Sequence, residues 1–421
     1  MNLRCSECGR DADPAQIVCA SCGGLLAFEL DPARIDTAHL RALLRERRAS
    51  NSHQDQSGVW RYRELLPEIP PEAIVTLREN MAPLYAGPVG AAYAHADRLT
   101  YLHLGMNPTG SFKDAGMTVA ISRAKASGAR ACICASTGNT AAAMAAYAKR
   151  AGIVPVVLVP SKGISESKVA QTLDYGASVI AIDGDFDAAL ETVRKLDPNR
   201  IAIVNSINPY RIEGQKTAAY QLLEARDWRV PDWVVLPGGN MGNTSAFGKG
   251  FREALALGLI DRLPRLAVVQ ASGAAPFARV VIEGGEMIPV AAKTTATAIK
   301  IGAPASWKKA LHEVTQAFGT ALAVSDEEIA DAKAIVGRDG IGCEPASAAS
   351  LAGLRILRER GTIAASDDVV LVLTGHVLKD PGYSAEYHGS SATFANRIVL
   401  ARDEADLFER IDAAASAAAH V

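Results

Sequence analysis

The sequence has almost no net charge and no long hydrophobic run. Its 44 Lys and Arg residues nearly balance 46 Asp and Glu residues, which leaves a formal net charge of −2. A chain that binds nucleic acid or an anionic membrane through charge carries a basic excess, so neither is expected as its main partner. No run approaches the ~18 apolar residues that cross a bilayer, and residues 1–5 lack the apolar stretch of a signal peptide. We therefore expect a soluble, cytoplasmic protein.

Repeats and low-complexity segments are also scarce. We find no repeat of fixed period, and the one biased segment is the alanine-rich tail at residues 413–419. A length of 421 residues allows roughly two or three domains of ordinary size and a large buried core.

The cysteines are concentrated at one end. Four of the seven lie in the first 22 residues as two Cys-x2-Cys pairs, Cys5 with Cys8 and Cys19 with Cys22, each followed by glycine. This spacing is typical of a zinc ribbon, in which four thiolates close a tetrahedral structural site. The alternative is a pair of disulfides, which a cytoplasmic protein rarely forms. We predict a ribbon at residues 1–30, and expect the remaining cysteines to be small buried residues: Cys132, Cys134 and Cys343.

Beyond a charged, partly helical connector at residues 31–76, apolar and amphipathic segments alternate. This alternation predicts an α/β fold with parallel sheets covered by helices in a catalytic region at residues 77–421. The strands are expected at 154–159, 178–182, 201–205, 233–236, 266–270 and 369–373, and the helices at 166–174, 186–196, 213–226 and 326–336.

One turn places a lysine at the start of a helix. Residues 107–114, Asn-Pro-Thr-Gly-Ser-Phe-Lys-Asp, separate the end of a strand at 102–105 from a helix at 115–126. Lys113 therefore falls on the first helical turn, where the helix dipole favours the neutral amine that condenses with a carbonyl. The simpler alternative is a solvated lysine after a turn.

Two further strand-to-helix turns are rich in small and amide residues. Residues 237–244 follow a strand and open a helix at 245–257, and residues 136–140 join a strand at 131–135 to a helix that ends near 151. Backbone N–H groups can converge on an anion at such turns, although glycine also serves ordinary ones. Together the three turns provide what a phosphorylated ring aldehyde would need.

Seven segments between residues 77 and 381 then carry a family resemblance. The chain resembles the threonine synthases, which are pyridoxal-phosphate enzymes of the tryptophan-synthase-β-like fold, fold type II. This implies two lobes, the smaller at about 105–212, with the cofactor in the cleft at the ends of parallel strands. The segments are NPTGSFKDAGMT, ASTGNTAAA, VNSINPYRIEGQKT, LPGGNMGNTSA, ATAIKIGAPASW, GCEPASAAS and LTGHVLKDP.

The resemblance assigns the cofactor-binding residues. Lys113 would hold the cofactor as a Schiff base and move protons at the α and β carbons of the substrate. Asn139 would hydrogen-bond the ring hydroxyl, or serve only as a helix N-cap. Thr374 would meet the pyridine nitrogen with a neutral hydroxyl, or be an ordinary strand-terminal threonine. The cofactor phosphate would be cradled by Gly239, Asn240, Met241, Gly242 and Asn243.

A second anion site is implied for the phosphate of O-phospho-L-homoserine. The guanidinium of Arg211 suits phosphate, although Arg211 could also be a surface residue that starts a helix. The matching positions are Ser136, Thr140, Asn205, Ser206 and Arg211.

The implied reaction is a γ-elimination followed by β-addition of water, which gives L-threonine and phosphate; the released phosphate helps to deprotonate the water. Alternatives from the same superfamily are a threonine or serine dehydratase, which binds no substrate phosphate, and a sulfite-using, cysteate-synthase-like β-replacement enzyme. A metal-tethered interaction module on a decayed enzyme is a third hypothesis, against which the intact lysine, amide and glycine positions argue. Relatives of this fold are commonly dimers, so a homodimer is expected.

Two positions depart from the family pattern, and a third has two possible roles. Val377 stands where the family usually has glycine, and because a β-branched residue resists positive φ, we expect a differently shaped loop and assign no contact to His376 or Lys379. Ala115 stands where arginine is common. Glu344 is expected either to point toward the cofactor ring or only to cap the helix that follows it.

Overall fold

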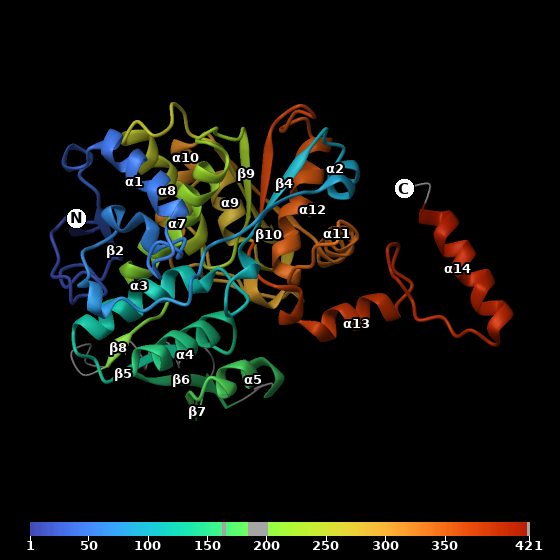
Figure 1. Cartoon of the computed structure of the whole chain (residues 1–421), viewed down its shortest axis with the longest axis horizontal. Helices are drawn as coiled ribbons and strands as arrows, with labels where there is room; N and C mark the ends of the chain where they lie inside the picture. Colours follow the sequence, from blue (N-terminus) through green and yellow to red (C-terminus); the bar gives the residue numbers. More distant parts are fainter. Residues whose placement is uncertain (162–165, 184–200, 419–421) are drawn as a thin grey trace. The chain divides into compact units, whose positions relative to one another are not determined.

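The computed structural model describes residues 1–161, 166–183 and 201–418 (Figure 1). The chain divides into two compact units, Met1–Lys379 and Asp380–Val421. In the described ranges no helix combines the length and the apolar character that crossing a membrane requires.

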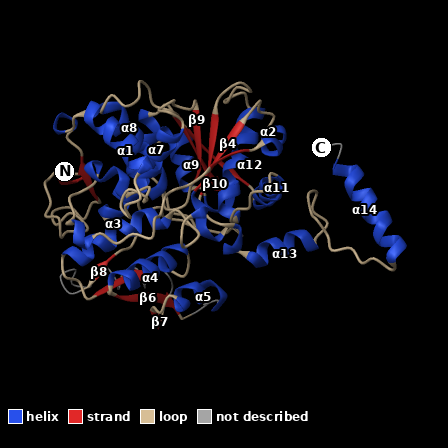
Figure 2. Cartoon of the chain, viewed as in Figure 1, coloured by secondary structure: helices blue, strands red, loops and turns tan. Residues whose placement is uncertain are grey.

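A six-stranded sheet forms the centre of the first unit. The strand order is β11-β10-β9-β12-β4-β3, and every pairing is parallel except that of β3 with β4. β9 and β12 are buried along their whole length, as expected for central parallel strands that helices cover on both faces (Figure 2). The bounds are β3 Leu84–Ala86, β4 Leu99–His103, β9 Trp233–Pro237, β10 Arg265–Ala271, β11 Thr320–Val324 and β12 Val369–Leu373.

A second, four-stranded sheet lies within residues 131–203. Its order is β7-β6-β5-β8 and all its pairings are parallel. The strands are β5 Ala131–Ala135, β6 Val154–Pro160, β7 Ser178–Ile182 and β8 Ala202–Ile203, and the helices joined to them are α3 Lys113–Ala126, α4 Asn139–Ala151 and α5 Glu166–Asp174.

The remaining helices cover the larger sheet or belong to the second unit. α12 packs against β9, β10 and β12, whereas α7 packs between α3 and α8. In the first unit these helices are α1 Thr37–Ala49, α2 Pro88–Tyr93, α7 Pro209–Ala225, α8 Gly242–Ala256, α9 Pro276–Glu283, α10 Trp307–Gln316, α11 Asp326–Arg338 and α12 Pro345–Glu359. The second unit contains α13 Pro381–Gly389 and α14 Glu404–Ala418.

A small antiparallel hairpin precedes these sheets. Strands β1 (Asn2–Cys5) and β2 (Leu26–Glu29) pair from Asn2 with Glu29 to Cys5 with Leu26. Leu26 and Phe28 are buried in the same hydrophobic core as Met117 of α3. The hairpin is therefore part of the first unit's core.

The predicted α/β alternation is confirmed, but several bounds differ. β8 spans only Ala202–Ile203 of the predicted 201–205, because the side-chain amide of Asn205 replaces strand pairing by donating to and accepting from the backbone of Ala135. α7 begins at Pro209 instead of 213, since Asn208 caps it through a bond from Tyr210 N–H. The helix predicted at 186–196 lies outside the described residues.

Candidate active site

Three loops meet at the carboxyl ends of neighbouring parallel strands. β9, β12 and β4 are adjacent in the larger sheet, so the glycine-rich loop, Thr374 and the loop before Lys113 start from the same edge. The second and third loops are joined directly: Phe112 N–H donates to the Thr374 carbonyl at 2.9 Å, and His376 N–H donates to the Gly110 carbonyl at 2.9 Å.

Lys113 is the first residue of α3, as the sequence predicts. Burial and the nearby guanidinium of Arg211 lower its pKa to about 7, and the Glu344 carboxylate only partly opposes them. A lysine that is substantially unprotonated near neutral pH is a competent nucleophile for an aldehyde.

Asp114 fixes the turn that leads into Lys113. Its buried carboxylate accepts from the Thr109 hydroxyl at 2.6 Å and the Thr109 N–H at 3.1 Å. Burial raises the pKa of Asp114 to about 7. The carboxyl group therefore ties the helix start back onto the preceding turn.

Glu344 links the two sheets. It is the N-cap residue of α12, but its side chain makes no capping bond, so the capping interpretation is wrong. The carboxylate instead accepts from Asn139 Nδ2 at 2.9 Å and Thr374 Oγ1 at 3.1 Å. Asn139 is likewise not an N-cap, since Gly138 precedes it in that position and α4 begins at Asn139. Both side chains are thus free of helix capping and face each other across the site.

Ser347 and Gly375 complete this network, and neither was predicted. The Ser347 hydroxyl oxygen accepts from Thr374 N–H at 2.8 Å and Gly375 N–H at 3.0 Å. A Cβ added to Gly375 would lie 2.2 Å from Cδ of Glu344. Gly375 therefore has to be glycine for the carboxylate to reach Thr374. No local sequence signal connects these residues, because Ser347 lies in α12 and Gly375 in the separate segment that follows β12.

The glycine-rich loop ends at the first turn of α8. Met241 has a left-handed backbone, φ 63°, as the N-cap residue. A Cβ on Gly239 would lie 3.2 Å from the Ala298 carbonyl oxygen. At the helix start, Asn243 Nδ2 and Thr244 Oγ1 are buried without a hydrogen-bond partner.

These features fit a phosphorylated ring aldehyde. The loop provides backbone N–H groups at a helix start and unused polar atoms for a phosphate, and Lys113 provides the amine. Asn240 is held in place by its own bonds, because its Nδ2 donates to Ser206 Oγ at 2.6 Å and its Oδ1 accepts from Ala305 N–H at 2.6 Å.

Arg211 is buried without an anionic partner. Its residue is only 2% exposed, and no carboxylate in the described ranges pairs with it. Its Nη1 donates to the Val204 carbonyl at 3.4 Å, and its Nε has no hydrogen-bond partner among the described residues. Burial lowers its pKa to about 10. The surface-arginine interpretation is therefore wrong, and a buried guanidinium of this kind calls for an anion.

The other residues predicted for the substrate anion lie at the ends of β5 and β8. Ser136 Oγ accepts from Gly138 N–H at 3.2 Å, and Thr140 lies in the first turn of α4. The amide of Asn205 is engaged with Ala135 and the hydroxyl of Ser206 with Asn240. Since β5 and β8 are paired strands, these residues share one edge of the smaller sheet.

Val377 and Ala115 are both accommodated. Val377 starts a short 3-10 turn, Val377–Lys379, and is not among the described residues with positive φ. Its side chain lies over Gly342, where an added Cβ would be 2.6 Å from Val377 Cβ. Lys379 Nζ donates to Gln171 Oε1 at 2.5 Å. Ala115 is 1% exposed, within the hydrophobic core.

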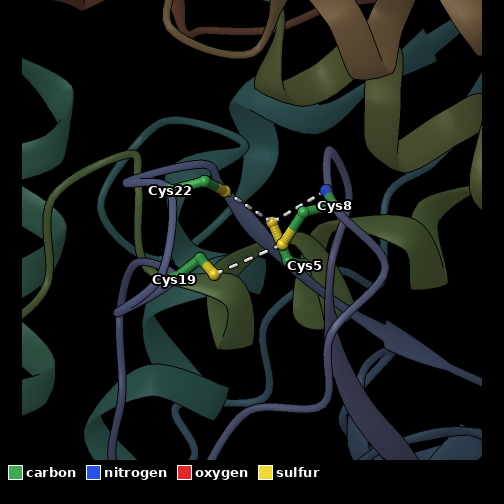
Figure 3. A group of neighbouring side chains, drawn as sticks. All are labelled: Cys5, Cys8, Cys19 and Cys22. Atoms are coloured by element: carbon green, nitrogen blue, oxygen red, sulfur yellow. Dashed lines mark hydrogen bonds between the residues drawn. The ribbon is translucent and has the colours of Figure 1, made fainter.

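The four N-terminal cysteines form one cluster (Figure 3). Their sulfur atoms all lie within 4.8 Å of one another, with Cys5 and Cys19 buried and Cys8 and Cys22 exposed. All seven cysteines of the chain are free thiols, and the three outside the cluster are buried as predicted. Four sulfurs so arranged fit a tetrahedral zinc site.

Comparison with known proteins agrees with this site. The sequence model of the family described as "pyridoxal-phosphate dependent enzyme" matches residues 79–375. A threonine synthase from Methanosarcina acetivorans is 43% identical over 90% of this chain and 92% of its own length. A threonine synthase from Mycobacterium tuberculosis is 48% identical over 78% of this chain and 91% of its own length.

A solved structure shares the fold. The threonine synthase from Escherichia coli superimposes with a TM-score of 0.69 at 22% identity, over 98% of this chain and 95% of that one. Together with the family match and the sequence identities, this shows that the chain belongs to the pyridoxal-phosphate-dependent enzymes and, among them, to the threonine synthases.

Proposed function

We propose that this enzyme converts O-phospho-L-homoserine and water into L-threonine and phosphate. The observation that carries the proposal is Arg211, a buried guanidinium that no carboxylate in the described ranges neutralises. It is close enough to Lys113 to lower the pKa of the amine. A substrate that reaches Lys113 with its amino-acid end and Arg211 with a phosphate would satisfy both groups.

Pyridoxal phosphate would be held by Lys113, the glycine-rich loop, Asn139 and Thr374. When bound, it withdraws electrons from the substrate's carbon skeleton and so acidifies the C–H bonds next to the amino group. The loop would take its phosphate mainly through N–H groups of residues 239–243. Asn139 would lie at the ring hydroxyl and Thr374 at the ring nitrogen, both oriented by the Glu344 carboxylate to which they donate.

The reaction breaks the bond that joins the substrate's carbon chain to its phosphate group and forms a new bond between the chain and the oxygen of water. The Cγ–O bond breaks, and phosphate leaves with the bridging oxygen and the electron pair. Cβ loses one proton and Cγ gains one, the oxygen of water bonds to Cβ, and the released phosphate accepts the remaining proton of water. Lys113 would carry the protons at the α and β carbons, a role for which a pKa of about 7 is suitable. Arg211 would hold the phosphate, with Ser136, Thr140, Asn205 and Ser206 around it.

Replacement of Arg211 tests the proposal. Arg211→Ala should lose at least about tenfold in phosphate release from O-phospho-L-homoserine, since a charge-assisted contact contributes ~1.5–3 kcal/mol. The affinity for pyridoxal phosphate, followed by visible absorbance, should change much less. Arg355→Ala removes a half-buried arginine that pairs with Glu359, and it is the matched control. Equal loss of cofactor binding and phosphate release in Arg211→Ala would contradict the assignment.

We also propose one structural zinc ion bound by Cys5, Cys8, Cys19 and Cys22. Four thiolates leave no open position for chemistry, and a reducing, cytoplasmic compartment would keep the thiols from oxidising. Elemental analysis should find one zinc per chain, and Cys19→Ser should lose it. A wild-type protein purified without chelator and free of metal would refute this assignment.

The proposed organisation is a ribbon at 1–30, a connector at 31–76 and a catalytic region at 77–421 with its smaller lobe at about 105–212. The β1–β2 hairpin supports the ribbon at 1–30, and the four-stranded sheet supports the smaller lobe at about 105–212. A homodimer belongs to the same proposal, and analytical ultracentrifugation tests it.

A further inference from the structure

The helix that carries Arg211 is also the helix on which the N-terminal hairpin docks. Tyr210, the preceding residue, is 6% exposed. Its ring packs edge-on against Phe28 of β2, with the centroids 4.8 Å apart. Its hydroxyl donates to the Pro14 carbonyl at 3.1 Å. Two parts of the cysteine-rich segment, β2 and the loop between the cysteine pairs, therefore hold this one side chain.

A second contact lies one helical turn further on. Glu213 is buried and forms an ion pair with Lys249 of α8. The Lys249 ammonium also donates to the Phe28 carbonyl at 2.6 Å. Residues 210 and 213 lie on the same side of α7 because they are three positions apart. The hairpin thus contacts the side of the helix that presents Tyr210 and Glu213, directly and through Lys249.

Lys309 extends the contact to α10. Its ammonium donates to the Leu26 carbonyl at 2.5 Å. The carbonyls of Leu26 and Phe28, the two buried residues of β2, thereby accept from lysines of α10 and α8. The hairpin is anchored by buried hydrogen bonds to charged groups, which are among the stronger ones in proteins.

The position of Pro14 depends on the cysteine cluster. Pro14 lies in the chain between Cys8 and Cys19, whose sulfur atoms are 3.7 Å apart. A metal bound by the four cysteines would close this loop and hold the Pro14 carbonyl at the Tyr210 hydroxyl. Hydrogen bonds also hold the loop, from Ala12 N–H to the Leu3 carbonyl at 2.9 Å and from Ala15 N–H to the Asp13 carboxylate at 2.7 Å. The metal would add to them by joining the two ends of the loop, since small metal-bound modules usually owe much of their stability to the metal.

Arg211 has no such anchor of its own. Within the described ranges, the hydrogen bond of its side chain is the one from Nη1 to the Val204 carbonyl at 3.4 Å. Its place in the site is therefore set by the backbone at the start of α7. That backbone is fixed by the Asn208 cap, by packing against α3 and by the contacts of the hairpin with Tyr210.

We propose that the metal-loaded ribbon is a positioning element for the substrate's phosphate: by holding Tyr210 it fixes the start of α7 and so presents Arg211 to the anion. Tyr210 is then a positioning residue that never touches the substrate. The inference rests on the proposed function, because it assumes that Arg211 binds the phosphate. It predicts that metal loss weakens anion binding while leaving the cofactor bound.

The test measures the affinity of the full-length holoenzyme for inorganic phosphate by calorimetry. Tyr210→Phe keeps the ring against Phe28 and removes the hydroxyl that donates to the Pro14 carbonyl. We expect its phosphate dissociation constant to rise about three- to tenfold, the effect of losing one buried hydrogen bond. The KM for O-phospho-L-homoserine should rise similarly while kcat is largely kept. Tyr93→Phe, on α2, is the matched control and should bind phosphate as the wild type does.

Removal of the metal provides the second arm. Cys8→Ser alters an exposed ligand of the cluster, and its holoenzyme should show the same selective loss of phosphate affinity with unchanged cofactor affinity. If Tyr210→Phe and Cys8→Ser both bind phosphate as tightly as the wild type, while Arg211→Ala does not, the positioning role is refuted and the proposed function stands. If Arg211→Ala also binds phosphate normally, the proposed function itself fails.

Discussion

At the scale of single residues, the site depends on charges that are buried near one another. Burial and then the Arg211 guanidinium lower the pKa of Lys113, and the Glu344 carboxylate opposes them. Glu344 in turn accepts from Asn139 and Thr374, so a single carboxylate influences the amine and orients two further polar side chains. A neutral amine, a cation and a carboxylate are thereby kept together without one neutralising another.

The reactivity of Lys113 should follow its lowered pKa. A lysine with a pKa of about 7 instead of 10.5 gains its unprotonated form as pH rises through 7. The rate at which the apoenzyme captures pyridoxal phosphate should therefore rise through about pH 7 and level off above it. Because Arg211 lowers this pKa, Arg211→Ala should move the midpoint upward. Stopped-flow absorbance gives both profiles, and a wild-type midpoint near 10 would contradict the account.

The close approach of Gly375 and Glu344 gives a second prediction. In Gly375→Ala the new methyl group would lie 2.2 Å from Cδ of Glu344, so the carboxylate must leave Thr374. Turnover should fall by an order of magnitude or more, since a misplaced active-site group can cost about 100-fold. Gly382→Ala is the control, because nothing lies within 4 Å of its added Cβ. Steady-state rates and circular dichroism separate a displaced carboxylate from misfolding; wild-type turnover in Gly375→Ala would refute the clash.

The sequence was informative about some of these residues and silent about others. Lys113 could be placed at a helix start because strand, turn and helix signals are local. Ser347 and the true role of Glu344 could not be predicted, because their partners come from other loops and only the sheet order brings them together.

At the scale of elements, α3, which begins with Lys113, crosses α7, which carries Arg211. The two helices approach so closely that a Cβ on Gly214 would lie 1.8 Å from the Ala115 carbonyl oxygen. Gly116, on the facing helix, is nearly as confined, since its added Cβ would lie 2.9 Å from the Arg211 carbonyl oxygen. The spacing between Lys113 and Arg211 is thus set by two glycines that take no part in the reaction.

Gly214→Ala should separate these helices. We expect a loss of about 1–3 kcal/mol in the free energy of unfolding, the usual cost of overpacking, together with weaker phosphate binding. Gly337→Ala, in α11, is the control because its added Cβ meets nothing within 4 Å. Urea unfolding measures the stability of both variants. A Gly214→Ala variant as stable as the wild type would contradict the close approach of α3 and α7 at this glycine.

Element boundaries were predicted where hydrophobic periodicity decides them and missed where side chains intervene. The strand at Val369–Leu373 matches its prediction at both ends, since an apolar run bounded by polar residues marks it. β8 is shorter than predicted because the Asn205 amide takes over its pairing. β11, Thr320–Val324, was not predicted.

At the scale of the whole molecule, sheet order creates the site. β12 lies between β9 and β4, which brings Thr374 beside the lysine turn and the glycine-rich loop. The sequence predicts parallel sheets but not the order of their strands, because that order depends on pairing between distant segments. The docking of the cysteine-rich hairpin on Tyr210 could not be predicted for the same reason.

The reaction proposed for this chain is cleavage of the Cγ–O bond of O-phospho-L-homoserine and addition of water at Cβ. The most direct test is turnover in water enriched in oxygen-18, with mass spectrometry of both products. We expect threonine labelled in its hydroxyl group and phosphate without label, since phosphate leaves with the bridging oxygen. Labelled phosphate with homoserine would show simple hydrolysis, and 2-oxobutyrate formed from threonine with no threonine formed from the phosphorylated substrate would show a dehydratase; either result would contradict the claim.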